Sequence, residues 1–279
     1  PTRRSSDLLE IFYADGYEVT TYRLGTEIRR ITFTGTWTLE SDEVLSRRAQ
    51  LEAAAALWLE GLPDGTDDFE KAKYIYDALI LRTEYEQGSV DSQTICSVLL
   101  NQRSVCQGYA KTFQYLCQLA GIPAMLVTGD VNGEGHAWNI VFLDGDWYYI
   151  DPTWGDASYQ REEGEETPAL TETVNYDYFC VTTQEIDRTH SMDDNQLLPV
   201  CNAVQDQYYR HEGLYLQSAD KEKIDEIFAR AAQKGAPMVC FQCADDTVYQ
   251  EVYRLLIEEQ GIFAYLPESE TTAAYLDSD

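Results

Sequence analysis

The stretch from residue 106 to residue 151 constrains the fold more than any other part of this sequence. It begins with a predicted helix over residues 106–120, which Gly121 and Pro123 end. The short turn at residues 144–146 lies between two apolar stretches and predicts a β-hairpin. The strands are expected at residues 124–129, 137–143 and 147–151.

The region before this stretch predicts β structure followed by a helix. Residues 17–39 alternate between apolar and polar side chains, which indicates strands. We therefore interpret residues 9–40 as the remnant of an N-terminal β region. Ser41 and Asp42 are expected to cap a helix that ends near Leu59.

A second predicted helix begins near Asp67. Its apolar residues recur at helical spacing, so one face of the helix is expected to lie in the core. A short helix is expected at residues 95–100. The apolar face of the second helix consists of Ala72, Ile75, Tyr76, Leu79 and Ile80.

The sequence after about residue 199 predicts a small α/β segment of its own. The helix of residues 106–120 is expected to bury Tyr109, Phe113, Leu116 and Leu119. Residues 159–173 are acidic and rich in turn formers, as in a surface loop. The C-terminal elements are expected as strands at 215–217, 237–242 and 262–266, with helices at 221–234 and 247–260.

The charge of the chain excludes one class of partner. Its 279 residues include 49 acidic and 20 basic side chains, which give a formal net charge of −29. So acidic a surface repels phosphate backbones, and we expect no nucleic-acid partner. The acidity is explained by solubility more simply than by a cationic partner.

The seven cysteines do not form the pattern of a small disulfide-linked protein. Their number is odd, so at least one thiol is free or paired outside the chain. Cys240 and Cys243 have the spacing of half a zinc site, but no second pair follows. We therefore expect no metal and no cofactor. No run of apolar residues reaches the length of a membrane span.

The first eight residues, Pro1 to Leu8, read like a translated sequencing adapter. We expect them to be an artefact and the natural N-terminus to be missing. Such a segment is excluded from fold reasoning.

Cys106 lies in the first turn of its predicted helix. Backbone N–H groups and the helix dipole favour an anion there, and a thiolate is the nucleophilic form of cysteine. The Cys106 amide is also a donor for an oxyanion. A lone helical cysteine is, however, more often a buried hydrophobic residue.

His136 opens one predicted strand of the hairpin, and Asp151 closes the other. With an offset in register, the hairpin brings the two side chains together. The acid would then hold the imidazole in the tautomer that faces the sulfur. Each residue alone has a simpler explanation, since a histidine can be purely structural and an aspartate before proline is usual in turns.

Three runs of this sequence resemble the core of the bacterial transglutaminase-like superfamily. They are VCQGYAKTFQYLCQLAGIPAMLVTG, HAWNIVFLDGDWYYIDPTWGD and NYDYFCVTTQEIDRTH. The resemblance is strongest over residues 67–156 and weaker to residue 190. It implies a papain-like α+β core, in which the nucleophile helix packs on an antiparallel sheet that carries the histidine and the aspartate.

The resemblance implies that Cys106, His136 and Asp151 form a catalytic triad. Cys106 would attack a carboxamide or peptide carbonyl of a protein or peptide substrate, and a thioester would form. Water as acceptor gives a protease or a deamidase, and a lysine amine gives a cross-linking transglutaminase. We favour hydrolysis. The alternative from another class is a non-catalytic module that binds peptides or cell-wall material.

The further site candidates rest on the same resemblance. Tyr85 and Gln102 are candidates for the second oxyanion donor, the latter by analogy with papain-type enzymes, and Gln107 follows the nucleophile. Trp138 either walls the acyl site or fills the core. All of these have packing or surface roles as alternatives. His190 and His211 have no ligating neighbours at a useful spacing and are assigned no role.

The domain organisation follows from these interpretations. Residues 41–198 are expected to form the transglutaminase-like catalytic domain, and residues 199–279 a small α/β accessory domain. An extracellular or cell-surface location is favoured over a cytoplasmic one, because relatives of this composition often carry export signals. The oligomeric state is left open.

Overall fold

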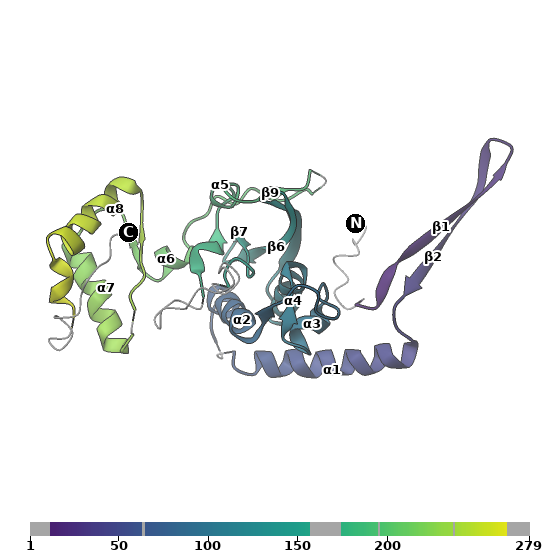
Figure 1. Ribbon diagram of the computed structural model, residues 1–279, viewed down its shortest axis with the longest axis horizontal. Helices are drawn as coiled ribbons and strands as arrows, with labels where there is room; N and C mark the ends of the chain where they lie inside the picture. Colours follow the sequence, from purple (N-terminus) through teal and green to yellow (C-terminus); the bar gives the residue numbers. More distant parts are fainter. Residues whose placement is uncertain (1–11, 63–64, 157–173, 195, 237, 267–279) are drawn as a thin grey trace. The chain divides into compact units, whose positions relative to one another are not determined.

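The computed structural model describes residues 12–62, 65–156, 174–194, 196–236 and 238–266. The described residues form two compact units, one up to residue 203 and one from residue 204 onward (Figure 1). The expected adapter segment at 1–8 and the acidic loop expected at 159–173 lie outside the described residues.

The first unit is built around a five-stranded antiparallel sheet with the strand order β8-β7-β6-β5-β9. Leu143 pairs with Asp146, so the hairpin between β6 and β7 has a two-residue turn. Both turn residues have positive φ, 47° at Asp144 and 102° at Gly145, as the tight turns of twisted hairpins require. The strands are β5 (Ala124–Val131), β6 (Glu134–Leu143), β7 (Asp146–Ile150), β8 (Phe179–Val181) and β9 (Ser191–Met192).

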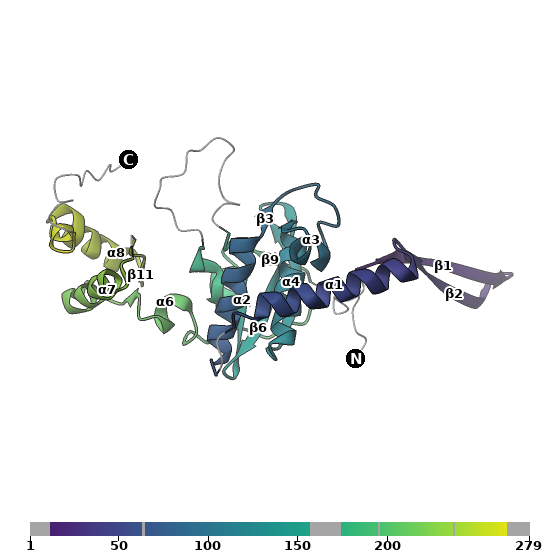
Figure 2. The same cartoon turned by 90° about the horizontal axis from the view of Figure 1, so that it is seen from below.

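Helix α4 (Cys106–Leu119) packs on one face of this sheet, beside β6 (Figure 2). Ala110 of the helix meets Leu126 and Ala137 in a buried cluster. Asn139 of β6 is fully buried, and its Nδ2 donates a hydrogen bond of 2.9 Å to the carbonyl of Ala110. This bond fixes the helix against the strand that carries His136.

The prediction for the buried face of α4 was correct for three of its four residues. Tyr109, Phe113 and Leu116 are buried, but Leu119 is 52% exposed. At 3.6 residues per turn, Leu119 lies about 80° around the helix from Tyr109, at the edge of the packed face.

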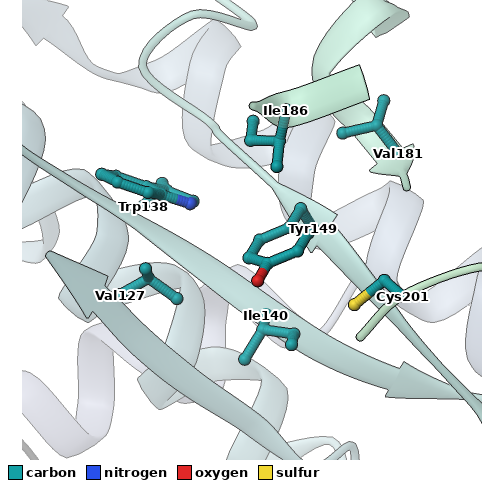
Figure 3. Close-up of a cluster of buried hydrophobic side chains, with 7 residues drawn as sticks. All are labelled: Val127, Trp138, Ile140, Tyr149, Val181, Ile186 and Cys201. Atoms are coloured by element: carbon teal, nitrogen blue, oxygen red, sulfur yellow. The ribbon is translucent and has the colours of Figure 1, made fainter. Parts of the chain in front are cut away.

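The opposite face of the sheet carries a second cluster of buried side chains, drawn in Figure 3. Trp138, Ile140 and Tyr149 project from the strands, and Ile186 of the short helix α5 (Thr183–Ile186) covers them. The cluster is completed by Val127, Val181 and Cys201. The sheet is therefore buried on both faces around the hairpin.

The remaining elements of the first unit include the expected second helix, α2 (Asp68–Arg82), whose predicted apolar face is buried. The β structure expected at 17–39 is present as a hairpin. The expected cap of α1 was wrong: Glu40 is the capping residue and makes no side-chain cap bond, because the helix begins at Ser41. The bounds are β1 (Ala14–Leu24), β2 (Glu27–Trp37), α1 (Ser41–Leu59), β3 (Glu84–Tyr85), α3 (Ile95–Leu99), β4 (Arg103–Ser104) and η2 (Tyr176–Tyr178).

The second unit has a largely helical core. Its elements are α6 (Tyr208–His211), β10 (Tyr215–Leu216), α7 (Lys221–Lys234), β11 (Gln242–Cys243), α8 (Asp246–Tyr253), the π-helical turn η3 (Arg254–Glu258) and the 3₁₀ turn η4 (Gly261–Ala264). The two short strands pair in parallel. The helix predicted at 221–234 is confirmed.

Two strand predictions in this unit were wrong. Of the described residues in the strand expected at 237–242, only Gln242 lies in a strand, β11, which pairs with the two residues of β10. The strand expected at 262–266 is the 3₁₀ turn η4 instead. Ile262 and Tyr265 both pack on the unit's core, and their spacing of three residues fits one side of a 3₁₀ turn.

None of the helices in the described part of the chain combines the length and the apolar character needed to cross a membrane.

Candidate active site

Cys106 is the first residue of α4, and its side chain is half-buried. The residue before it, Val105, makes no side-chain cap, and the first turn of the helix holds no acidic residue. The positive end of the helix dipole therefore acts on the sulfur without a competing carboxylate in that turn.

The loop that leads into Cys106 is held by a buried group of hydroxyls. Ser104 Oγ donates to the carbonyl of Ser92 at 2.8 Å and lies 2.7 Å from Ser97 Oγ. A Cβ at Gly108 would come within 1.9 Å of Ser104 Oγ. Glycine at this position thus permits the close approach that places the sulfur at the start of the helix.

His136 and Asp151 meet at the open end of the β6–β7 hairpin. Asn139 pairs with Ile150, so the residue after Ile150 lies opposite Trp138 and diagonal to His136. This diagonal places the two side chains on the same face, within reach of each other. His136 Nε2 lies 2.7 Å from Asp151 Oδ2.

The carboxylate of Asp151 is fully buried and has four donors around it. Oδ1 accepts from the backbone N–H of Thr153 at 2.8 Å and of Trp154 at 3.2 Å. Oδ2 faces Nε2 of His136 at 2.7 Å and of His190 at 3.0 Å. Burial alone would raise the pKa of Asp151, but the charge and hydrogen bond of His136, and then His190, lower it to about 2. The site holds this residue as an anion.

The imidazole of His136 is 8% exposed. Burial lowers its pKa, but the charge and hydrogen bond of Asp151, with a smaller contribution from the Cys106 thiol, raise the pKa to about 10. Because Nε2 is engaged by Asp151, Nδ1 is the nitrogen left to face the sulfur. The three residues therefore form one chain of contacts in the order thiol, imidazole, carboxylate.

Trp138 lies behind His136 and belongs to the core. Its side chain is fully buried, and its ring stacks on that of His136 with 5.8 Å between centroids and 21° between planes. It supports the imidazole by packing, so the core role is the one that the structure shows for it.

The candidates Tyr85, Gln102 and Gln107 all lie on or beside the segment that leads into α4. Tyr85 is in β3, pairs with Ser104 of β4, and its ring lies 6.2 Å from that of Tyr109. Gln102 is exposed and has a positive φ of 57°, in the turn before β4. Gln107 is the half-buried second residue of α4.

His190 is the residue that sequence reasoning missed. It is 3% exposed, and its ring lies among those of Trp138, Trp154 and Tyr178. The expectation that it has no useful neighbours was wrong, because its contact with Asp151 joins positions 39 residues apart. In the sequence, the signal that could have identified His190 is its position at the end of NYDYFCVTTQEIDRTH, the third run that resembles the superfamily.

His136, Asp151 and His190 also qualify by composition and spacing as a metal-binding group, with candidate ligand atoms within 4.8 Å of one another. Their nitrogen-to-oxygen distances of 2.7 and 3.0 Å are those of hydrogen bonds. We interpret the group as a hydrogen-bonded one.

This geometry agrees with the family to which the central part of the sequence is assigned. Residues 59–152 match the model of the transglutaminase-like superfamily. The matched range contains Cys106, His136 and Asp151, together with the helix and the hairpin that hold them.

Two curated relatives are similar to part of this chain. Human Kyphoscoliosis peptidase is 32% identical over 111 residues, which cover 34% of this chain and 17% of that protein. The mouse protein of the same name is 31% identical over 111 residues, which also cover 34% of this chain and 17% of that protein. The chain thus spans about a sixth of the length of these relatives.

Among solved structures, a transglutaminase titled "Crystal structure of a TGase" is similar with a TM-score of 0.35 and 15% identity, covering 62% of this chain and 52% of that one. A structure from Cytophaga hutchinsonii, described as a "Putative Cysteine Protease", is similar with a TM-score of 0.33 and 19% identity. That similarity covers 49% of this chain and 62% of the other.

Proposed function

We propose that this protein is a cysteine-dependent enzyme that transfers acyl groups from amide bonds of proteins or peptides. The observation that carries the proposal is the contact chain from Cys106 through His136 to Asp151. A thiol at a helix N-terminus, an imidazole beside it and a buried carboxylate behind the imidazole are the parts that nucleophilic acyl transfer needs.

In the first half of the reaction, the Cys106 thiolate, paired with the His136 imidazolium, attacks the amide carbonyl and forms a tetrahedral intermediate. The N–H group of Cys106 at the start of α4 is a donor for the oxyanion. His136, protonated on both nitrogens, gives its Nδ1 proton to the leaving nitrogen. The C–N bond then breaks, an amine or ammonia departs, and a thioester on Cys106 remains.

In the second half, neutral His136 takes a proton from the acceptor as the acceptor attacks the thioester. The C–S bond breaks and the Cys106 thiolate returns beside the imidazolium. Asp151 remains an anion throughout and stabilises the imidazolium of each half-reaction.

We favour water as the acceptor, which makes the enzyme a peptidase or a deamidase. The curated relatives are named as peptidases, which supports this choice over cross-linking. A lysine amine as the acceptor would instead make the protein a transglutaminase.

A turnover assay tests the proposal and separates these acceptors. The full chain is incubated with an unfolded glutamine-rich protein, with and without a labelled primary amine, and with Cys106→Ala as the control. We expect ammonia release or new peptide ends that require Cys106. Incorporation of the amine in place of these products would reverse our choice of acceptor, and turnover that survives Cys106→Ala would refute the mechanism.

A further inference from the structure

We propose that His190 is a positioning residue of this site, which holds the Asp151 carboxylate in place for His136 by donating a second hydrogen bond to Oδ2. The inference rests on the proposed function, since it concerns the same triad. It assigns a task to a histidine that lies outside the range matched by the family model.

The first argument is the arrangement of donors around Asp151. The two imidazole Nε2 atoms converge on one oxygen, at 2.7 Å from His136 and 3.0 Å from His190. The other oxygen accepts two backbone N–H groups. A carboxylate has about four acceptor sites, so this one is fully used. Without His190 the oxygen that faces His136 would lose the donor that fixes its direction.

The second argument is that His190 is itself oriented for this task. Its Nδ1 lies 2.7 Å from the hydroxyl of Thr189, and its backbone N–H donates to the carbonyl of Ile186 at 2.9 Å. An ionised carboxylate can only accept a hydrogen bond, so the proton between His190 and Asp151 is carried by Nε2 of the imidazole. The turn that carries His190 follows helix α5, whose start is fixed by a reciprocal capping box of Thr182 and Glu185.

The third argument is the packing of the His190 ring. It meets Trp138 edge-on at 4.8 Å between centroids, and the rings of Trp154 and Tyr178 lie at 5.2 and 5.9 Å. These aromatic side chains restrict the tilt of the imidazole. Packing alone would be satisfied by an apolar ring, whereas the structure directs both ring nitrogens to hydrogen-bond partners.

The titratable groups around Asp151 come from several elements. His136 approaches from β6 and His190 from the turn after α5, with Cys106 of α4 beyond His136. Tyr178 flanks the His190 ring, and the Tyr76 hydroxyl of α2 lies 3.5 Å from the Asp151 carbonyl. The donors to the carboxylate itself favour its anionic form, and removing one makes protonation easier.

The experiment compares His190→Phe, which keeps an aromatic ring, with His190→Gln, which keeps an N–H donor. The rate of Cys106 alkylation by iodoacetamide is measured across pH by mass spectrometry, with His211→Phe in the second unit as the matched control. We expect His190→Phe to move the acidic limb of the profile to higher pH and to lower the plateau on the order of 10-fold. His190→Gln should bring both the acidic limb and the plateau rate most of the way back to the wild-type values. His211→Phe should change neither the limb nor the plateau.

A role confined to packing would give a different result. His190→Phe would then keep the wild-type acidic limb, and His190→Gln would be the more damaged variant; this outcome overturns the inference while leaving the proposed function intact. Thermal melting of each variant identifies any loss that comes from unfolding.

A second readout does not depend on reactivity. The chain has three histidines, so their ring nitrogens can be assigned by NMR in ¹⁵N-labelled protein. We expect a proton on His190 Nε2 and a shift of the His136 Nε2–H signal in His190→Phe. A bare Nε2 on His190 would refute the inference. If wild-type Cys106 shows no selective reactivity, the proposed function fails, and these signals still decide whether His190 orients Asp151.

Discussion

Asp151 Oδ2 lies 2.7 Å from His136 Nε2, although the two residues belong to opposite arms of the β6–β7 hairpin. The relationship is diagonal, because the register places the residue after Ile150 opposite Trp138. It gives the imidazole a buried anion on one side and leaves its other nitrogen for Cys106. The chemistry that we propose depends on this pairing, and the following predictions test it.

The charge of Asp151 is predicted to control the reactivity of Cys106. Asp151→Asn keeps the size of the side chain but removes the anion that raises the pKa of His136. We expect the alkylation rate of Cys106 at neutral pH to fall roughly 100-fold or more. Asp193→Asn, at an exposed position in the same unit, is the control and should leave the rate unchanged. A rate in Asp151→Asn equal to that of the wild type would contradict the role of the anion.

The pair should also stabilise the fold within a defined pH window. The lowered pKa of Asp151 contributes stability that is fully present above about pH 4 and is lost as the pH falls through about 2. The raised pKa of His136 contributes stability that is fully present below about pH 6.5 and is lost as the pH rises through about 10.

The free energy of unfolding in urea is therefore compared between the wild type and the double variant Asp151→Asn/His136→Gln at a series of pH values. The difference should be largest between about pH 4 and 6.5 and should shrink on both sides. A difference that is constant with pH would show that the pair's ionisation does not contribute.

Gly108 is predicted to be essential for the packing of the loop before Cys106. In Gly108→Ala the new Cβ would come within 1.9 Å of Ser104 Oγ, and we expect a loss of about 1–3 kcal/mol of stability. Gly135→Ala is the control, because its Cβ would meet no atom within 4 Å. Melting temperatures measure both.

The same clash predicts a specific non-additivity. Ser104→Ala removes the hydroxyl that the new methyl group meets, so Gly108→Ala should cost less in that background than in the wild type. Strictly additive costs in the double-mutant cycle would show that the hydroxyl is not the source of the strain.

Much of the site could be predicted from local sequence patterns. The helix that begins at Cys106 and the hairpin around Gly145 follow from periodicity and turn chemistry, which act over a few residues. These two elements are enough to suggest that the cysteine, the histidine and the aspartate come together.

The rest depends on tertiary contacts that no local pattern encodes. His190 reaches Asp151 only because residues 179–192 return to both edges of the sheet as β8 and β9. In the second unit, the apolar residues 262–266 fit a strand and a 3₁₀ turn equally well, and packing of Tyr265 on Phe228, at 4.2 Å between ring centroids, accompanies the turn.

The central claim is that His136 activates Cys106, and the relative alkylation rates of the cysteines test it most directly. Burial raises the pKa of Cys117 and Cys201, so both should react slowly, and the partly exposed Cys240 and Cys243 provide the comparison within the same chain. At neutral pH and below, Cys106 should react at least about 10-fold faster than either of these two, and His136→Ala should abolish the advantage. Equal rates for Cys106, Cys240 and Cys243, unchanged by His136→Ala, would contradict the account.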